Sequence, residues 1–257
     1  MENAVSQKKD KLNNIEILRI LSMFLVVVSH SIYHGYMTNE NIREYYQFNS
    51  ALGIINWATM EALYVISCVA VNCFVMISGY FLIDKVKHRW NGILRTWIQT
   101  VFYCICFLIV AIYLGEEVGP KDIIFSILPI YGGRYWFVSC YIGLMLIAPF
   151  LSMVAMSIDK RQYQIMLMIL FILNFQLLYG SVYGGFNTLL WFSFIYLMAG
   201  YIKIFDIPFF GKENKGLVLL LCWAALVILA FIYNLVQCGG QISLVSTAYH
   251  GPVFFSH

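Results

Sequence analysis

Residues 17–31 read Ile-Leu-Arg-Ile-Leu-Ser-Met-Phe-Leu-Val-Val-Val-Ser-His-Ser and form the centre of an apolar run over residues 14–36. A helix crosses a bilayer with about 20 mostly apolar residues, so this run is long enough to span a membrane. It also carries Arg19 and His30, although a charge at the bilayer centre costs roughly 2.5–3.5 kcal/mol on insertion scales. The run therefore predicts a transmembrane helix whose ionisable residues need partners.

Arg19 and His30 share one face of this helix. They are 11 positions apart, which is close to three turns and roughly 16 Å along the axis. Glu16 precedes Arg19 by three residues, where an ion pair along the helix can form, and His34 extends the stripe. Taken singly, Arg19 also fits an interfacial arginine that fixes topology, and His30 a packing histidine. Their shared face favours a functional stripe that looks into the protein.

Composition identifies a membrane protein. The 257 residues are 61% hydrophobic and 11% charged, whereas soluble domains have about 45–50% and about 25%. Seven cysteines are scattered mostly through apolar runs without a C-x-x-C pair, which argues against a disulfide framework and a zinc site. No basic patch is interleaved with exposed aromatic residues, so nucleic-acid binding has no support.

Further apolar runs predict an all-α bundle of about seven to eight transmembrane helices. Spans after the first are expected at residues 62–83, 92–114, 135–156, 164–179, 187–205 and 216–236, with an eighth run ending at His257. Residues 37–60 are expected to form a polar loop, and residues 123–130 a re-entrant or interfacial segment. Residues 1–12 are interpreted as a basic tail and residues 13–257 as one membrane domain.

The positions of lysine and arginine predict the orientation. With the N-terminus in the cytoplasm, thirteen of these residues fall on the cytoplasmic side and three outside, which is the bias typical of cytoplasmic loops. Arg19, Arg89 and Arg95 are then expected near the cytoplasmic face, and His30 lies deeper, towards the outside.

Two further segments carry polar or aromatic motifs. The second span contains Asn72-Cys-Phe-Val-Met-Ile-Ser-Gly-Tyr80, in which Gly79 permits close helix approach and Asn72 can bond across an interface. Helix packing alone also explains this pattern. The fourth span opens with Arg134-Tyr-Trp-Phe137, and such aromatic residues are usually a membrane-interface belt.

Together these segments resemble the integral-membrane acyltransferase family 3, whose members O-acylate cell-surface glycans in bacteria and other substrates elsewhere. The resemblance rests on Asn14-Ile-Glu-Ile-Leu-Arg19, on an arginine and a histidine separated by ten residues, on Phe74-x-x-x-Ser-Gly-Tyr80, and on Tyr135-Trp-Phe-x-x-x-Tyr141 with Pro149. It implies a multi-pass protein of the cell membrane that takes an acyl group from acyl-CoA inside and delivers it to a hydroxyl outside. Members usually have more spans, so we expect this chain to lack the last family helices.

The resemblance assigns roles to residues of this chain. His30 and Arg19 are the expected catalytic pair: His30 deprotonates the hydroxyl, because its ordinary pKa is near 6.5, or carries the acyl group transiently. Arg19 positions the donor or the histidine. Arg89 and Arg95 are expected to bind the phosphates of acyl-CoA, since guanidinium groups bind phosphate bidentately. Residues expected to shape the passage are Ser78, Tyr80, Trp136 and Tyr141.

The expected donor is acetyl-CoA or another acyl-CoA with a small acyl group, the expected acceptor is a surface glycan, and no metal is expected. Two other classes of protein remain open. A transporter of a sugar or polyanionic solute would use Arg19 and His30 as its gate, although the internal repeats frequent in transporters are not evident. The second of these classes is a non-catalytic membrane sensor or partner protein. The sequence also leaves the oligomeric state open.

Overall fold

The computed structural model describes residues 2–33, 35, 51–85, 90–128, 135–174, 189–205 and 228, and within these ranges all regular structure is helical. Two compact units make up the chain. One comprises Met1–Ile77 with Pro208–His257, and the other Ser78–Ile207. The boundary between them falls inside a single long helix, α3. The prediction of an all-α membrane protein is confirmed for the described part of the chain.

The first unit contains α1 (Glu2–Ile32) and most of α3 (Ala51–Leu82). Each holds a stretch long and apolar enough to cross a membrane, at Ile15–Ile32 and Ala62–Leu82. The expected polar loop over residues 37–60 is wrong for residues 51–60, which already belong to α3. These ten residues are largely apolar and helix-compatible, and the helix satisfies their backbone groups within the segment, as a membrane environment requires. The rest of that loop lies outside the described residues.

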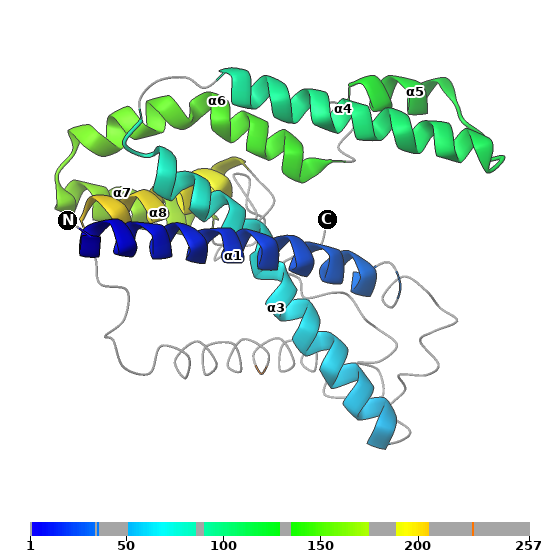
Figure 1. Ribbon diagram of the computed structural model, residues 1–257, viewed down its shortest axis with the longest axis horizontal. Helices are drawn as coiled ribbons and strands as arrows, with labels where there is room; N and C mark the ends of the chain where they lie inside the picture. The colour runs from blue at the N-terminus through cyan, green and yellow to red at the C-terminus, as the bar shows by residue number, and fades with distance from the viewer. Residues whose placement is uncertain are drawn as a thin grey trace. The chain divides into compact units, whose positions relative to one another are not determined.

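Within the described residues, the second unit contains the last turn of α3 and the helices that follow it along the chain (Figure 1). These are α4 (Trp90–Tyr113), α5 (Pro120–Ile127), α6 (Trp136–Ser157), α7 (Lys160–Asn174) and α8 (Leu189–Ile204). Helix α6 packs against α8 and α4, α7 packs against α8, and the short α5 lies on α4. Helices α4 and α6 match expected spans and are long enough to cross a membrane, whereas α7 and α8 are shorter. Apart from residue 228, the expected seventh span and eighth run lie outside the described residues.

Local sequence signals set several helix ends. After α4, Gly115 adopts a left-handed φ of 83°, and its N–H donates to the Ile112 carbonyl at 3.1 Å. This is the glycine-ended turn that satisfies the last carbonyls of a helix. Before α7, the Asp159 carboxylate accepts from the Gln162 N–H at 2.8 Å, and the Gln162 side chain accepts from the Asp159 N–H at 3.0 Å. Such a reciprocal pair satisfies two otherwise orphaned donors at a helix start.

Helix α8 forms the centre of the second unit. Its side chains at Phe192, Tyr196 and Leu197 are at most 1% exposed, because α6 and α7 cover it on different sides. Helix α6 packs inward through one face, on which the buried residues are spaced three or four positions apart: Leu144, Ala148, Ser152 and Ala155. From α7, the buried Tyr163 hydroxyl donates to the Leu197 carbonyl at 2.8 Å.

Two glycines let the end of α3 approach α8 closely. A Cβ added at Gly79 would meet the backbone of Tyr196, with Tyr196 Cα 2.9 Å away. A Cβ at Gly200 would meet the side chain of Ile83, at 2.5 Å from its Cγ1. Each glycine therefore lies opposite a large residue of the other helix. The expected role of Gly79 in close helix approach is confirmed.

Candidate active site

The candidate functional residues fall into two parts, each described within its own unit, and the first part is the polar stripe of α1. The Arg19 guanidinium forms an ion pair with Glu16, 2.8 Å from its carboxylate, as the spacing predicts. Helical geometry places His30 three turns further along the same helix. The stripe thus has a paired cation at one end and a titratable ring at the other.

One contact of His30 indicates which ring nitrogen carries the proton. Its Nδ1 lies 2.9 Å from the Val26 carbonyl oxygen, and a carbonyl oxygen only accepts hydrogen bonds. In the neutral ring Nδ1 therefore carries the proton and donates it to Val26, while Nε2 keeps its lone pair. In this tautomer Nε2, and not Nδ1, is the ring nitrogen that can accept a proton in general-base catalysis.

The stripe is more exposed than its sequence predicts. Arg19 and His30 are both exposed, and the buried residue on this part of α1 is Ser22, whose hydroxyl donates to the Leu18 carbonyl at 2.7 Å. On the helical wheel, at about 100° per residue, Arg19 and His30 lie together and Ser22 lies to one side of both. The expectation that the stripe looks into the protein is therefore not met within the described part of the chain. Arg19 obtains its counter-charge from its own helix through Glu16.

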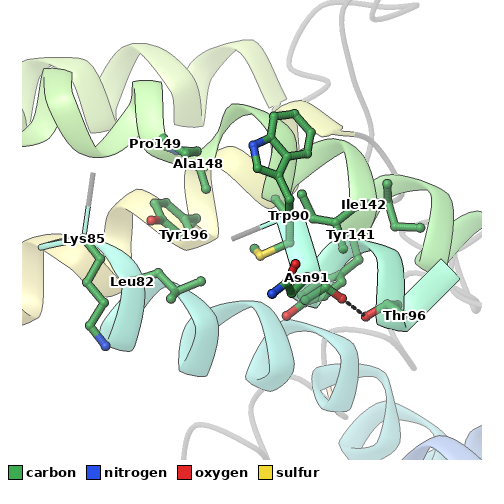
Figure 2. A pocket seen from close by; sticks show the side chains of 13 residues that line it. Leu82, Lys85, Trp90, Asn91, Thr96, Tyr141, Ile142, Ala148, Pro149 and Tyr196 are labelled. Atoms are coloured by element: carbon green, nitrogen blue, oxygen red, sulfur yellow. Dashed lines mark hydrogen bonds between the residues drawn. The ribbon is translucent and has the colours of Figure 1, made fainter. Parts of the chain in front are cut away.

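The second part is a cavity of about 540 Å³ within the second unit (Figure 2). It lies among the end of α3, the first turns of α4, the middle of α6 and Tyr196 of α8. Its apolar lining comes from Leu82, Trp90, Ile93, Ile142, Met145, Ala148 and Pro149, and its polar lining from Lys85, Asn91, Thr96, Tyr141 and Tyr196. Mostly apolar walls with a few polar groups, at about 300–1,000 Å³, are typical of small-molecule sites.

The structure brings two of the predicted residues together at this cavity. The hydroxyls of Ser78, in the last turns of α3, and Tyr141, on α6, are 3.0 Å apart and share a hydrogen bond. Tyr141 lines the cavity directly, and its ring stacks on Phe137 with centroids 5.8 Å apart. Two hydroxyls so placed can hold a carbonyl or an amide of a bound ligand.

The other predicted residues take separate positions. Tyr80 lies against Lys203, whose ammonium is 5.6 Å from the ring centroid. Trp136 packs edge-on against Phe192 at 6.2 Å, as a packing residue does. Arg95 is exposed on α4 and is not among the cavity-lining residues, although its neighbour Thr96 is. The predicted Arg89 lies outside the described residues.

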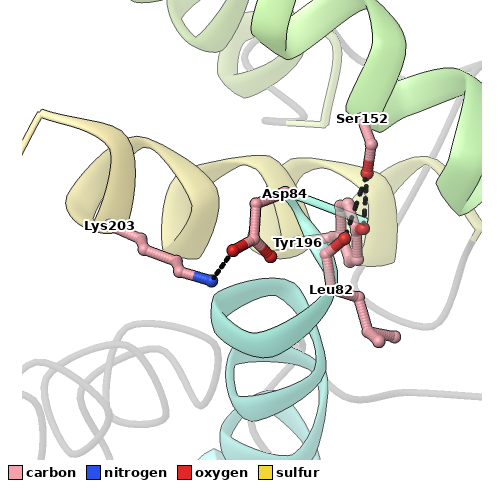
Figure 3. Close-up of polar contacts among 5 residues, drawn as sticks. All are labelled: Leu82, Asp84, Ser152, Tyr196 and Lys203. Carbon is pink, nitrogen blue, oxygen red and sulfur yellow. Dashed lines mark hydrogen bonds and ion pairs between the residues drawn. The ribbon is translucent and has the colours of Figure 1, made fainter. Parts of the chain in front are cut away.

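Sequence reasoning missed two polar pairs near the end of α3, Asp84 with Lys203 and Ser152 with Tyr196 (Figure 3). Lys203 pairs with Asp84 at 2.8 Å, and the lysine holds the pKa of the Asp84 carboxyl below its ordinary value, chiefly through this hydrogen bond. Tyr196 hydrogen-bonds Ser152 at 2.9 Å, and both side chains are fully buried. A serine and a tyrosine inside otherwise apolar runs were the available signal, because buried hydroxyls need partners.

Comparison with protein-family models gives one finding. The model described as an acyltransferase domain, of the third family of that name, matches residues 12–256. No curated protein and no solved structure matches the chain.

Proposed function

Because this chain belongs to acyltransferase family 3 and is a membrane acyltransferase, we propose that it moves an acyl group from acyl-CoA in the cytoplasm to a hydroxyl of a cell-surface glycan. The acyl group in this proposal is acetyl or a similarly small one. The observation that carries the donor assignment is the 540 Å³ cavity, which has Lys85 at one end and hydroxyl and amide groups along its wall.

The cavity lining suits the donor's chemical character. The arm of acyl-CoA that bears the thioester is an alternation of short apolar segments and amides, and its nucleotide end carries phosphates. Asn91 and Tyr141 offer partners to amides, and Ile142 and Met145 offer apolar contact. Lys85 offers a cation for phosphate. Under the predicted orientation this end of the cavity faces the cytoplasm, where acyl-CoA is available.

His30 performs the proton transfer in this proposal. Its Nε2 removes the proton from the acceptor hydroxyl, and the hydroxyl oxygen attacks the thioester carbonyl. The bond between that carbonyl and the CoA sulfur breaks, and the leaving thiolate takes up the proton. The Nδ1–H bond to Val26 keeps the ring in the required tautomer. A histidine that first receives the acyl group is the alternative route through the same ring.

The decisive experiment is acyl transfer by full-length protein in membrane vesicles supplied with labelled acetyl-CoA. His30→Ala should lower the rate by about 10²–10⁴-fold, the usual contribution of a general base, while the protein remains inserted and folded. His34, four residues further along the sequence, lies outside the described residues, and His34→Ala is the matched control that should keep most of the activity. A folded His30→Ala protein that still acylates its acceptor at the wild-type rate would remove the catalytic assignment.

A second experiment tests the arginines assigned to the donor's phosphates. If Arg19, Arg89 or Arg95 binds phosphate, its alanine variant should lose more CoA affinity than its lysine variant, because lysine keeps the charge and loses only the bidentate geometry. Wild-type CoA affinity in all three alanine variants would exclude them as donor ligands.

A further inference from the structure

The turn that ends α3 is held against α8 at three successive points. Gly79 lies against the Tyr196 backbone, and Ile83 occupies the space in front of Gly200. The third point is the ion pair of Asp84 with Lys203, 2.8 Å between carboxylate and ammonium. The first two contacts fix the helix backbone. The third fixes a side chain in the segment that leads into the cavity.

One backbone and one side-chain hydrogen bond also hold this segment, and Figure 3 draws the bond from Ser152. The Leu82 carbonyl accepts from the Lys85 N–H at 2.8 Å and from the Ser152 hydroxyl at 3.5 Å. Ser152 is in turn bonded to the Tyr196 hydroxyl. The backbone at Lys85 is therefore anchored to α6 and, through Ser152, to α8. Lys85 lines one end of the cavity, and its ammonium extends away from the other lining side chains (Figure 2).

The Asp84–Lys203 pair has a second consequence, which concerns charge. Asp84 is the immediate neighbour of Lys85, and an unpaired carboxylate there would compete with any anionic ligand for the lysine and would repel that ligand. The side chains of Lys203 and Asp84 are 26% and 46% exposed, and ion pairs between such exposed groups contribute little to folding.

We propose that Lys203 is a positioning residue that engages the Asp84 carboxylate, so that Lys85 remains available to bind a phosphate group of the donor at the end of the cavity. This rests on the proposed function, because it assumes that the cavity receives acyl-CoA. The proposal gives the two lysines different roles. Lys85 contacts the ligand, and Lys203 acts on Lys85 only through Asp84.

The test measures binding of CoA to the detergent-solubilised full chain by calorimetry. Lys85→Met should weaken binding about tenfold, which corresponds to about 1.4 kcal/mol. Lys203→Met should weaken it about fivefold, because the released Asp84 carboxylate then competes for Lys85. The double variant Lys203→Met with Asp84→Asn should bind within about twofold of wild type, since no carboxylate remains to compete.

Acyl transfer supplies a second readout. If Lys203 acts only on donor binding, Lys203→Met should raise the KM for acyl-CoA and leave kcat unchanged. The matched control is Lys160→Met. That lysine also lies over an aromatic ring, 5.8 Å from the centroid of Phe205, and is not among the cavity-lining residues. Lys160→Met should change neither the KM for acyl-CoA nor the affinity for CoA. A loss of affinity as large as that of Lys203→Met would overturn the proposal.

Recovery of CoA binding in the double variant distinguishes this inference from a simple loss of structure. The double variant lacks both members of the ion pair, so recovered binding cannot come from a better-packed protein. If Lys203 instead touched the phosphate itself, Asp84→Asn would restore nothing, and the inference would be wrong. Wild-type affinity in Lys85→Met would also overturn it. If the wild-type chain does not bind CoA at all, the proposed donor fails, and this inference fails with it.

Discussion

The close contact of Gly79 with the backbone of Tyr196 gives a sharp stability prediction, for the substitution Gly79→Ala. The new Cβ would lie 2.9 Å from Tyr196 Cα and 3.0 Å from its carbonyl carbon. Carbon atoms in favourable contact are about 3.5–4.0 Å apart, so the deficit is at least about half an ångström. Both opposing atoms belong to the α8 backbone, and no side-chain rotation relieves the clash. Helix α8 itself must move.

The magnitude follows from two opposing effects. Overpacking of this kind costs about 1–3 kcal/mol, and the rigid backbone contact places Gly79→Ala at the upper end. Replacing glycine by alanine inside a helix returns about 0.8–1 kcal/mol. The net loss is therefore about 2 kcal/mol, which for a chain of this size lowers Tm by about 4–8 °C.

The assay is thermal unfolding of the purified protein in detergent, with all variants scanned at the same rate. Gly143→Ala on α6 is the matched control, because its Cβ would be 3.4 Å and 3.5 Å from the two terminal methyl carbons of Leu189. That is ordinary contact with a flexible side chain, so only the helix-propensity gain remains and Tm should stay or rise slightly. Equal Tm values for the two alanine variants would refute the proposed contact between α3 and α8.

Two other predictions concern the same end of α3. Gly200→Ala should lower Tm by less than Gly79→Ala, because its Cβ meets the side chains of Ile83 and Tyr163 rather than backbone; an equal or larger loss measured in the same scan would contradict this ranking. The pKa of Asp84 is lowered in the folded protein, so its ion pair stabilises the fold above about pH 4, the ordinary pKa of aspartate, and this contribution disappears as the pH falls further. The small Tm difference between wild type and Asp84→Asn, worth at most about 1 kcal/mol, should therefore be constant from about pH 5 to 8 and should shrink as the pH falls below about 4 and through the lowered pKa of the folded carboxyl. A difference that grows on acidification would show that another group is responsible.

The Arg19–His30 stripe shows which features of a candidate site can be predicted from the sequence and which cannot. The one-turn pairing of Arg19 with Glu16 was predictable because it depends only on helical spacing. The tautomer of His30 was not, because it depends on the rotamer that brings Nδ1 to the Val26 carbonyl. Within the described residues the stripe is exposed, although it was expected to look into the protein; a shared helix face does not say what covers that face.

What the sequence by itself determined is everything that depends on a short stretch of chain. Apolar runs of sufficient length predicted the helices at Ala62–Leu82, Trp90–Tyr113 and Trp136–Ser157, because a bilayer demands length and internal hydrogen bonding within one segment. The family motifs are likewise local. The cavity and the Lys203–Asp84–Lys85 arrangement depend instead on which helices meet and at which level. Only the tertiary structure decided that Gly79 faces Tyr196 and that Gly200 faces Ile83, because the contact of two backbones is a property of both partners, and neither segment encodes it alone.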